Sequence, residues 1–346
     1  MNIAFRVDSS SKIGGGHFYR CLRFAEQLKK RNKIYFLSNL LSKYQKEIIK
    51  RKKFYLENIN INFSNTHKKY LEIKSLIKKN KIDYLIVDNY ETNSNLKKKI
   101  SSIVKKLIVI DDRIHEKHNA NILINNNYLN ENEKKEISKK NKNALKFLGP
   151  EFNFNIIKRK DIKKKNKCKK IFIFFGMIDH ENYTYKILQI LKRLERIKLI
   201  AVIGIFNKNK KKIINEFRNY KNIRIYEKLD NETLIKKISA SDLAIGSGGV
   251  NLIERISLGK ASIVISKVLN QKKGLINIKK KKIILKKKLP NLNKKFFKDF
   301  LNDDSNNKSL NFKKISLNCY KEALRIKQQK KIFINKFTKI IDNEKN

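Results

Sequence analysis

The first 28 residues combine, in this order, a short apolar strand, a glycine-rich loop and an amphipathic helix. The apolar run at 3–7 leads through a polar loop to three glycines at 14–16, and from Phe18 to Leu28 apolar residues recur at helical spacing. Strand, glycine loop and helix form the repeating unit of a parallel α/β sheet, and such a loop brings backbone N–H groups up to a phosphate. We therefore expect an α/β fold with a phosphate-binding loop after its first strand.

The first turn of that helix carries His17 and Arg20, which are three residues apart and are therefore neighbours on the helix surface. The dinucleotide-binding fingerprint G-x-G-x-x-G needs a third glycine where this chain has Tyr19, so that fingerprint is absent. Because the positive end of a helix disfavours an imidazolium, we expect the ring of His17 to be neutral and to accept a proton. The alternative is that His17 only caps the helix or bonds a loop carbonyl.

Continuous apolar runs recur along the chain between lysine-rich helical segments. They lie at 34–37, 84–87, 107–110 and 122–124 in the first half, and at 171–175, 199–203, 223–226, 243–245 and 262–265 in the second. Runs that are continuous rather than alternating predict parallel strands covered by helices on both faces. The pattern indicates two Rossmann-like doubly wound domains that face a cleft.

A basic stretch at 158–170 separates the two halves of the chain and is the natural linker. We expect an N-terminal domain at 1–157, with the glycine loop and His17, and a C-terminal domain at 171–307. Residues 308–346 form a tail whose pattern predicts one or two amphipathic helices, which either pack back onto the core or fray.

The chain of 346 residues contains 83 Lys and Arg against 31 Asp and Glu, a formal charge of +52. The lysines are spread over most of the length, and Asn and Ile are enriched with them, so AT-rich codon usage explains the excess without a nucleic-acid partner. No nucleic-acid-binding module is recognisable. A basic field does favour anionic substrates.

Three cysteines, at 21, 168 and 319, are too few and too far apart for a zinc site, which favours a reducing compartment. No apolar run reaches the roughly 18 residues of a membrane-spanning helix, and no signal peptide precedes the first strand. These features predict a cytoplasmic protein without an integral membrane segment. Loose association with an anionic membrane surface and the oligomeric state stay open.

Polar residues follow three predicted strands of the first half. They are Asp8, then Asp88, Asn89 and Tyr90, and finally Asp111, Asp112 and Arg113. The carboxyl ends of parallel strands meet at one edge of a sheet, so we expect a polar floor for a sugar beside the His17 loop. A metal pair at Asp111–Asp112 is disfavoured because no other ligands with metal spacing occur, and no metal is expected. His115 and His118 are expected on the surface.

A second glycine loop occurs at 246–249, between the strand at 243–245 and a helix that begins near Val250. It predicts a second phosphate cradle at a helix N-terminus. Glu254, about one turn into the helix, could accept hydrogen bonds from both hydroxyls of a ribose. Asn270 and Gln271 carry amides suited to sugar hydroxyls or to an N-acetyl group. The alternative is a tight turn followed by a favourable first-turn acid.

Five motifs in order resemble those of the PseG-type UDP-sugar hydrolases. They are VDSSSKIGGGHFYRC at 7–21, VDNY at 87–90, VIDDR at 109–113, FLGPEF at 147–152 and IGSGGVNLIERISLGKASIVI at 245–265. The last also resembles a motif of the MurG-type N-acetylglucosaminyltransferases. The resemblance covers roughly residues 3–275.

The resemblance implies a two-domain glycosyltransferase-B-like fold. It also implies hydrolysis of UDP-2,4-diacetamido-2,4,6-trideoxy-β-L-altropyranose to UDP and the free sugar, by inverting attack of water at the anomeric carbon. The reaction would serve the biosynthesis of pseudaminic acid, a nonulosonate of surface polysaccharides or glycosylated flagellin. It would need neither a metal nor a cofactor, and the small-molecule UDP-sugar would be the partner.

The resemblance also assigns roles to single residues. His17 would position or activate water, and Tyr90 would contact the substrate near the anomeric centre. Glu254 would hold the uridine ribose, Gly248 and Gly249 would contact the diphosphate, and Asn270 or Gln271 would lie near the sugar. Beside these assignments, we expect further substrate contacts from Asp8, Gly14, Gly16 and Arg20, and a further UDP contact from Asn251. Relatives carry a Gly-Gly-x-Asp-Pro-like turn where this chain has GMIDH at 176–180, which puts a diphosphate contact there in doubt.

Two other readings compete with the hydrolase. A MurG-like glycosyltransferase would transfer the UDP-linked amino sugar to an acceptor, but the region around His17 and Tyr90 resembles the hydrolases better. A non-enzymatic anion binder would rest on net charge alone and would leave both glycine loops unexplained.

Overall fold

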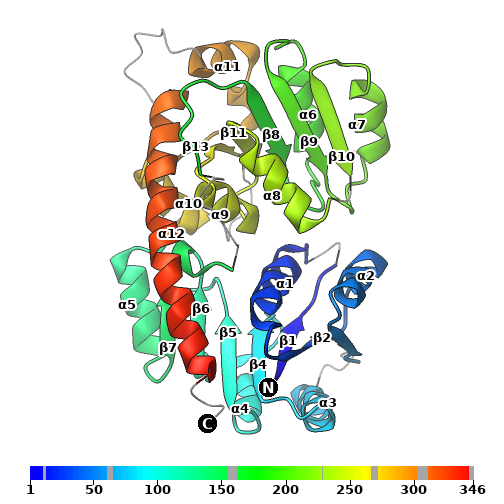
Figure 1. Cartoon of the computed structure of the whole chain (residues 1–346), viewed down its shortest axis with the longest axis vertical. Helices are drawn as coiled ribbons and strands as arrows, with labels where there is room; N and C mark the ends of the chain where they lie inside the picture. Colours follow the sequence, from blue (N-terminus) through cyan, green and yellow to red (C-terminus); the bar gives the residue numbers. More distant parts are fainter. Residues whose placement is uncertain are drawn as a thin grey trace. The chain divides into compact units, whose positions relative to one another are not determined.

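The computed structural model describes residues 1–10, 13–60, 65–154, 162–227, 229–265, 272–301 and 311–342. The chain divides into two compact units (Figure 1), Met1–Asn155 with Ile332–Asn346, and Ile156–Lys331. Each unit is built on one parallel β-sheet, with apolar cores on both of its faces. The α/β prediction of two doubly wound domains is confirmed.

The first unit has a seven-stranded sheet of order β3-β2-β1-β4-β5-β6-β7, in which every neighbouring pair is parallel. Its strands are β1 (Asn2–Val7), β2 (Lys33–Ser38), β3 (Tyr55–Asn58), β4 (Tyr84–Asp88), β5 (Lys106–Ile110), β6 (Ile122–Asn125) and β7 (Leu145–Leu148). Its helices are α1 (Gly16–Leu28), α2 (Lys43–Arg51), α3 (Thr66–Lys79), α4 (Ser94–Ser101) and α5 (Glu131–Lys140), with a 3₁₀ turn at Pro150–Phe152.

The second unit has a six-stranded parallel sheet of order β10-β9-β8-β11-β12-β13. Its strands are β8 (Lys170–Phe174), β9 (Lys198–Ile203), β10 (Ile223–Glu227), β11 (Leu243–Gly246), β12 (Ala261–Val264) and β13 (Ile284–Lys286). Its helices are α6 (Tyr183–Leu191), α7 (Lys210–Phe217), α8 (Asn231–Ser239), α9 (Val250–Ser257), α10 (Lys272–Lys280) and α11 (Lys294–Leu301), with a 3₁₀ turn at Leu289–Asn291. Helix α12 (Phe312–Asp342) ends the described chain.

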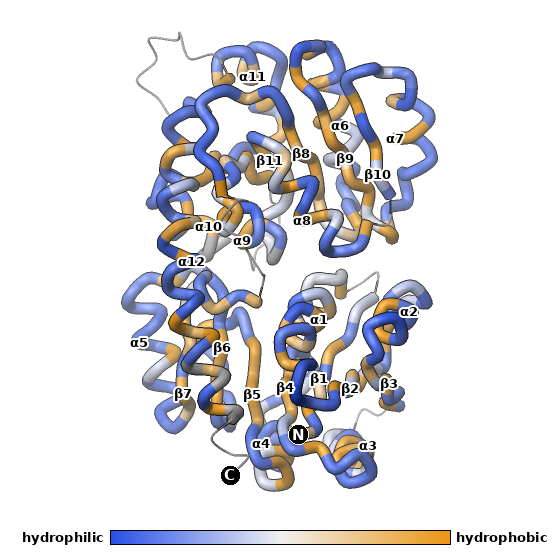
Figure 2. Tube along the Cα trace, in the orientation of Figure 1, coloured by the Kyte–Doolittle hydropathy of each residue, from blue (hydrophilic) through white to orange (hydrophobic). Residues whose placement is uncertain are grey.

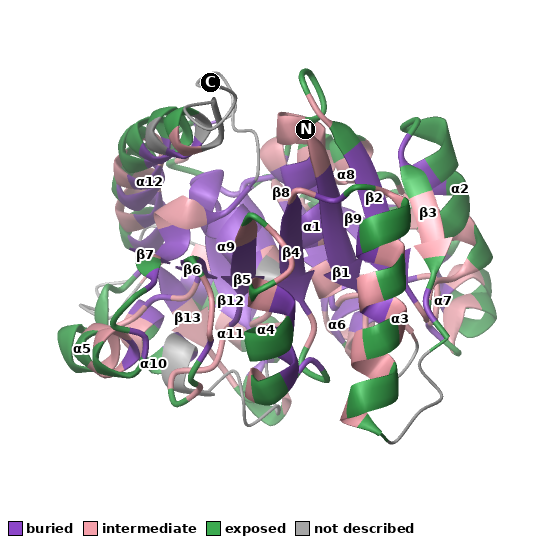
Figure 3. Cartoon of the chain, turned by 90° about the horizontal axis from the view of Figure 1, so that it is seen from below, coloured by how far each residue is buried: buried purple, intermediate pink, exposed green. Residues whose placement is uncertain are grey.

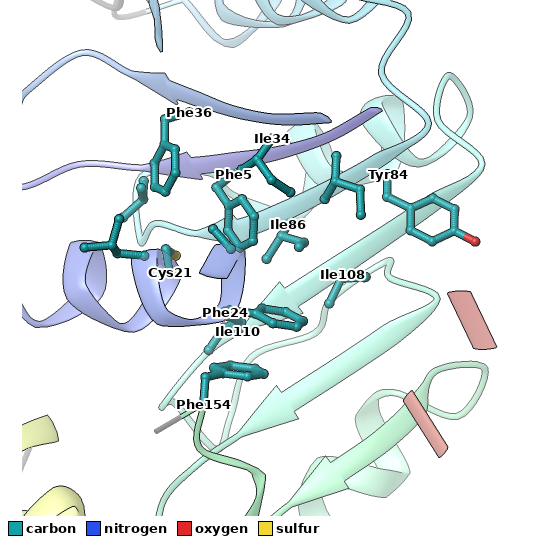
Figure 4. Packing of buried hydrophobic residues seen from close by; sticks show 14 of the residues in the cluster. Phe5, Cys21, Phe24, Ile34, Phe36, Tyr84, Ile86, Ile108, Ile110 and Phe154 are labelled. Atoms are coloured by element: carbon teal, nitrogen blue, oxygen red, sulfur yellow. The ribbon is translucent and has the colours of Figure 1, made fainter. Parts of the chain in front are cut away.

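The apolar strands are the buried centre of each unit, as the hydropathy colouring of Figure 2 and the burial colouring of Figure 3 show for β1 and β4. Helix α1 lies on β1 through Phe18, Cys21 and Phe24, all essentially inaccessible to solvent. In Figure 4 the ring of Phe24 stacks on that of Phe154, with centroids 3.8 Å apart. This packing fixes the position of α1, and with it the first turn that carries the candidate site.

The last helix is shared between the units. Its residues from Ile332 onward belong to the first unit, where Phe333 and Phe337 enter the core beside Phe147. The described part of the tail is therefore one helix, α12. Its last residues pack on the core of the first unit through the rings of Phe333 and Phe337.

All ten predicted apolar runs, including the one at 3–7, are strands. The prediction missed β3, β7 and β13, each of which lies at the edge of its sheet. Edge strands have one solvated side and are short. The sequences YLEN at 55–58 and LKFL at 145–148 therefore carry no continuous apolar run, whereas β13 has only the three apolar residues 283–285 between lysines.

Candidate active site

The strand order of the first sheet has one topological switch point. From β1 the chain moves outward to β2 and β3, whereas from β4 it moves the other way to β5, β6 and β7, so β1 and β4 flank the topological switch point. Ligands of open α/β sheets bind at this point. The loop after β1 leads to His17, and β4 ends at Asp88, which pairs in register with Val7.

The glycine loop before α1 is closed by local hydrogen bonds. The backbone N–H of Gly14 donates to the carbonyl of Ser10 at 2.8 Å, and the hydroxyl of Ser9 donates to the carbonyl of Gly14 at 2.9 Å. Gly14 has a φ of +82°, which favours glycine. Gly16 is the first residue of α1, so the loop delivers His17 to the second position of the helix.

His17 and Asp88 form a hydrogen-bonded pair. The Nδ1 atom of His17 lies 2.7 Å from Oδ1 of Asp88, so Nδ1–H donates to the carboxylate and leaves the lone pair on Nε2. Within the described part of the chain, Nε2 has no hydrogen-bond partner. The His17 side chain is 15% exposed, whereas Asp88 is buried. The arrangement holds one imidazole nitrogen ready to accept a proton.

The electrostatics of His17 differ from the prediction. Burial lowers the pKa of His17, but the Asp88 carboxylate more than offsets this, and the pKa lies above its ordinary value. The expectation that the helix end keeps the imidazolium disfavoured is therefore wrong, because a carboxylate at 2.7 Å outweighs a partial helix charge.

Arg20 anchors the same carboxylate from the next turn of α1. Its Nε and one terminal nitrogen donate to the two oxygens of Asp88 at 2.8 and 2.7 Å, and its other terminal nitrogen donates to Asp112 at 2.9 Å. Arg20 is buried, and Asp88 and Asp112 raise its pKa despite burial. The predicted substrate contact is thus a guanidinium committed to two carboxylates. When His17 is neutral, the cluster of His17, Arg20, Asp88 and Asp112 carries a net charge of −1.

Tyr90 lies beside His17. The two rings meet edge to face, with centroids 4.9 Å apart and planes at 84°. Tyr90 is 42% exposed, and the guanidinium of Arg113 lies 4.9 Å from the centre of its ring. Tyr90 is therefore an accessible aromatic wall next to the proton acceptor.

Asp8 is placed differently from the prediction of a substrate contact. It is buried and accepts hydrogen bonds from the Ser38 hydroxyl, the backbone N–H of Asn39 and the Nδ2 of Asn89, and it pairs with Arg6 at 2.6 Å. Burial opposes ionisation, but Arg6 holds the pKa of Asp8 below its ordinary value. Its carboxylate thus joins the ends of β1, β2 and β4.

The carboxylates considered as a metal pair are each held by an arginine, Asp111 by Arg113 and Asp112 by Arg20. Among the described residues, no group of three or more His, Cys, Asp and Glu is arranged to hold a metal ion. His115 is exposed as predicted. His118 is buried, which corrects the expectation of a surface residue, because it packs between Lys97 and Asp111.

The second unit has its own switch point, flanked by β8 and β11. Strand β11 ends at Gly246, where a Cβ atom would lie 2.1 Å from the carbonyl oxygen of Phe174. Gly249 caps the N-terminus of α9, and Gly248 lies half-buried in the same loop. Backbone geometry thus requires glycine at Gly246, which belongs to the predicted glycine loop but is not one of the predicted UDP contacts.

Arg255 lies beneath this loop. It is fully buried and donates from one terminal nitrogen to the carbonyl of Ser247, and from Nε to that of Asn251 at 3.3 Å. Its other terminal nitrogen has no hydrogen-bond partner in the described structure. Burial lowers its pKa to about 10. A cation is therefore held under the glycine loop at a helix N-terminus.

The remaining predicted UDP contacts are on α9. Nδ2 of Asn251 donates to the Glu254 carboxylate at 2.7 Å, and Glu254 is 2% exposed. The carboxylate is thus occupied by a neighbour on its own helix. Asn270 and Gln271 lie outside the described residues, as does part of the predicted linker, 158–161.

The loop after β8 departs from the expected turn in its structure as well. Asp179 accepts hydrogen bonds from the backbone N–H groups of Tyr183 and Thr184, at 2.8 and 2.9 Å, and so caps α6 with a carboxylate. A Cβ on Gly204 would lie 2.4 Å from the Cα of Met177, so the two backbones are in close contact. The N-terminus of α6 thus has an internal acid where an anion would bind.

Sequence reasoning placed Asp88 and Asp112 in the polar floor but did not identify them as partners of the α1 side chains. The signal was available: β4 adjoins β1 in a doubly wound sheet, so the residue that ends β4 lies beside the loop that follows β1.

Across the described residues, no helix is long and apolar enough to cross a membrane.

No protein-family model matches the sequence. The UDP-2,4-diacetamido-2,4,6-trideoxy-β-L-altropyranose hydrolase of Campylobacter jejuni is 28% identical over 268 residues, covering 76% of this chain and 90% of that protein. The spore coat polysaccharide biosynthesis protein SpsG of Bacillus subtilis is 24% identical over 281 residues, covering 78% and 79%. An uncharacterized protein of Methanocaldococcus jannaschii is 28% identical over 280 residues, and this chain spans 55% of its length.

Solved structures similar to this one include glycosyltransferases and UDP-N-acetylglucosamine 2-epimerases. MurG of Acinetobacter baumannii superposes with a TM-score of 0.62 at 13% identity, over 98% of this chain and all of that one. The glycosyltransferase of kitacinnamycin superposes with a TM-score of 0.64 at 10% identity, over 95% of both chains. The chain has the two-domain α/β fold of GT-B glycosyltransferases and is similar in sequence to a UDP-sugar hydrolase and to a polysaccharide biosynthesis protein.

Proposed function

We propose that this chain is an enzyme that acts on a UDP-sugar, and that it hydrolyses UDP-2,4-diacetamido-2,4,6-trideoxy-β-L-altropyranose to UDP and the free sugar. The observation that carries the proposal is the His17–Asp88 pair at the switch point of the first sheet, which leaves Nε2 of His17 without a partner in the described structure. The similarity to the Campylobacter hydrolase supports the choice of substrate. In this assignment the product is a precursor for pseudaminic acid.

The reaction needs one proton acceptor and a held leaving group. Water attacks the anomeric carbon while Nε2 of His17 takes its proton, and the bond from that carbon to the β-phosphate oxygen breaks with its electrons on UDP. Direct displacement inverts the configuration at the anomeric carbon. General base catalysis of this kind contributes roughly 10²–10⁴-fold in rate.

The charges around His17 suit this role. The cluster of His17, Arg20, Asp88 and Asp112 changes from a net charge of −1 to zero when His17 takes the proton. The buried Asp88 carboxylate therefore stabilises the imidazolium that forms in the transition state. We assign Arg20 the role of holding Asp88 in place, and Tyr90 that of contacting the sugar beside His17.

In the second unit we assign the diphosphate to the loop of Gly248 and Gly249, at the N-terminus of α9, with the Arg255 cation behind it. Glu254 and Asn251 are the proposed contacts for the uridine ribose. A nucleoside diphosphate leaves readily once its charge is held, so we expect turnover without added metal or cofactor.

An NMR time course tests the proposal. The purified protein is incubated with the diacetamido UDP-sugar, with UDP-N-acetylglucosamine in a parallel control, and without any acceptor, in buffer with EDTA and with Mg²⁺. We expect UDP and free sugar from the first substrate alone, at the same rate in both buffers. If both UDP-sugars stay intact, hydrolysis is excluded, and a glycosyltransferase that needs an acceptor becomes the better assignment.

A further inference from the structure

A buried network of polar side chains lies behind the candidate site in the first unit. Lys97 on α4 is 1% exposed, and no carboxylate of the described structure lies within ion-pair distance of its Nζ. That Nζ is instead 3.0 Å from Nδ1 of His118. Burying an ammonium group costs free energy unless the group has a hydrogen-bond partner. The contact with His118 supplies that partner for Lys97.

The contact determines the state of His118. Because an ammonium group only donates, Nδ1 of His118 must be the acceptor, and the proton of the neutral ring is on Nε2. Nε2 lies 3.5 Å from Oδ2 of Asp111. Burial and the neighbouring charge of Lys97 lower the pKa of His118 to about 4, so the ring is neutral at physiological pH.

From Asp111 the contacts continue to the candidate site. Asp111 accepts hydrogen bonds from Nε and a terminal nitrogen of Arg113, the latter at 2.7 Å. The guanidinium of Arg113 lies 4.9 Å from the ring centre of Tyr90, and Tyr90 meets His17 edge to face. A series of neighbouring side chains therefore leads from Lys97 to His17, and its longest polar approach is the 3.5 Å between His118 and Asp111.

We propose that Lys97 is a positioning residue of the candidate site, which acts through His118 and Asp111 to hold Arg113 against Tyr90 and so to set Tyr90 against His17. The backbone of the loop is anchored separately, because Asn141 accepts from the N–H of His118 at 2.7 Å and donates to the carbonyl of Glu116. Removal of the Lys97 ammonium group thus releases the side chains while the loop keeps its path. The kinetic part of this inference rests on the proposed function, but the structural part does not.

The structural test is histidine NMR on Lys97→Met, with the exposed neighbour Lys98→Met as matched control. The chain has five histidines, so their ring signals can be assigned by single substitutions. In the wild type and the control, His118 should be neutral with its proton on Nε2 down to about pH 5. In Lys97→Met its pKa should rise, and the ring signals of His17 should shift. An unchanged His118 titration, or an unmoved His17, would overturn the proposal.

The kinetic test separates positioning from general damage. Lys97→Met should lower kcat about tenfold with KM within about twofold, since it misplaces a wall of the site without removing a substrate contact. In a Tyr90→Ala background the same change should cost less than about twofold. Equal losses in both backgrounds would contradict action through Tyr90. If Lys97→Met does not fold, Arg113→Met, at a position that is 37% exposed, replaces it in both tests. A wild type without turnover refutes the proposed function, while the NMR result still decides the inference.

Discussion

Each of the two glycine loops of this chain connects a buried strand to a helix. The charged side chains near the first loop are paired with one another, whereas those near the second are only partly paired. Beside the loop before α1, the charged side chains of Arg20, Asp88 and Asp112 are paired with one another around His17. Beside the loop before α9, the guanidinium of Arg255 on α9 is buried with one nitrogen unpartnered in the described structure, and Oδ1 of Asn251 is unpartnered as well. Paired charges fix one proton acceptor, whereas unpaired polar atoms leave binding capacity for a ligand.

The comparison explains why the same local motif suits two tasks. A glycine loop with a helix end behind it attracts negative charge in either unit. In the first unit the protein's own Asp88 supplies a negative charge that binds the side chains of His17 and Arg20 on the first turns of α1. In the second unit, Asp179 caps the N-terminus of α6 after β8, whereas the N-terminus of α9 after β11 has no side-chain cap.

The largest expected effect comes from His17→Asn. Loss of the proton acceptor should lower kcat roughly 10²–10⁴-fold while UDP still binds, because binding is assigned to the second unit. Steady-state rates and calorimetric titration with UDP measure the two separately. His115→Asn, at an exposed histidine of the same unit, is the matched control. Near wild-type turnover in His17→Asn would remove the general-base assignment.

The second largest effect is expected from Asp88→Asn, which should lower kcat about 10²-fold. A neutral partner no longer raises the pKa of His17, so the base stays unprotonated to lower pH. In the wild type, kcat/KM should rise with pH through a value above 6.5, and in the variant this limb should move to lower pH. A limb that does not move would show that another group titrates. Thermal unfolding is recorded in parallel, because Arg20 loses a buried partner.

Alanine at the glycines tests the loops themselves. Gly246→Ala should destabilise the protein by about 3 kcal/mol and weaken UDP binding, since its Cβ meets the carbonyl of Phe174. Gly14→Ala should cost only about 1 kcal/mol, because the site has a φ of +82° but nothing within 4 Å of the added methyl. Denaturant unfolding measures both, and equal losses would contradict this difference.

Among the variants expected to weaken UDP binding, the smaller effect comes from Arg255→Met, which should weaken it about tenfold, or about 1.4 kcal/mol, and leave uridine binding unchanged. The exposed Arg224→Met is the control for loss of one positive charge. Equal losses of UDP affinity in both variants would mean that the general basic field, not the buried cation, attracts the diphosphate.

Much of this fold could be predicted because buried parallel strands have continuous apolar sequences. The site could be predicted where the order of residues along a short stretch of sequence determines the local structure, as for the glycine loop that precedes His17. It could not be predicted where partners depend on strand order, as for Asp88, or on packing of loops, as for Lys97 with His118. The basic charge gave no indication of these buried networks, since most lysines are solvated.

Turnover in water enriched in ¹⁸O is the most direct test of the central claim that water attacks the anomeric carbon. The isotope shift in the ³¹P NMR spectrum of the released UDP shows which bond has broken. Attack at carbon predicts that the β-phosphorus of UDP carries no ¹⁸O. A β-phosphorus with one ¹⁸O atom would place the attack at phosphorus and contradict the mechanism.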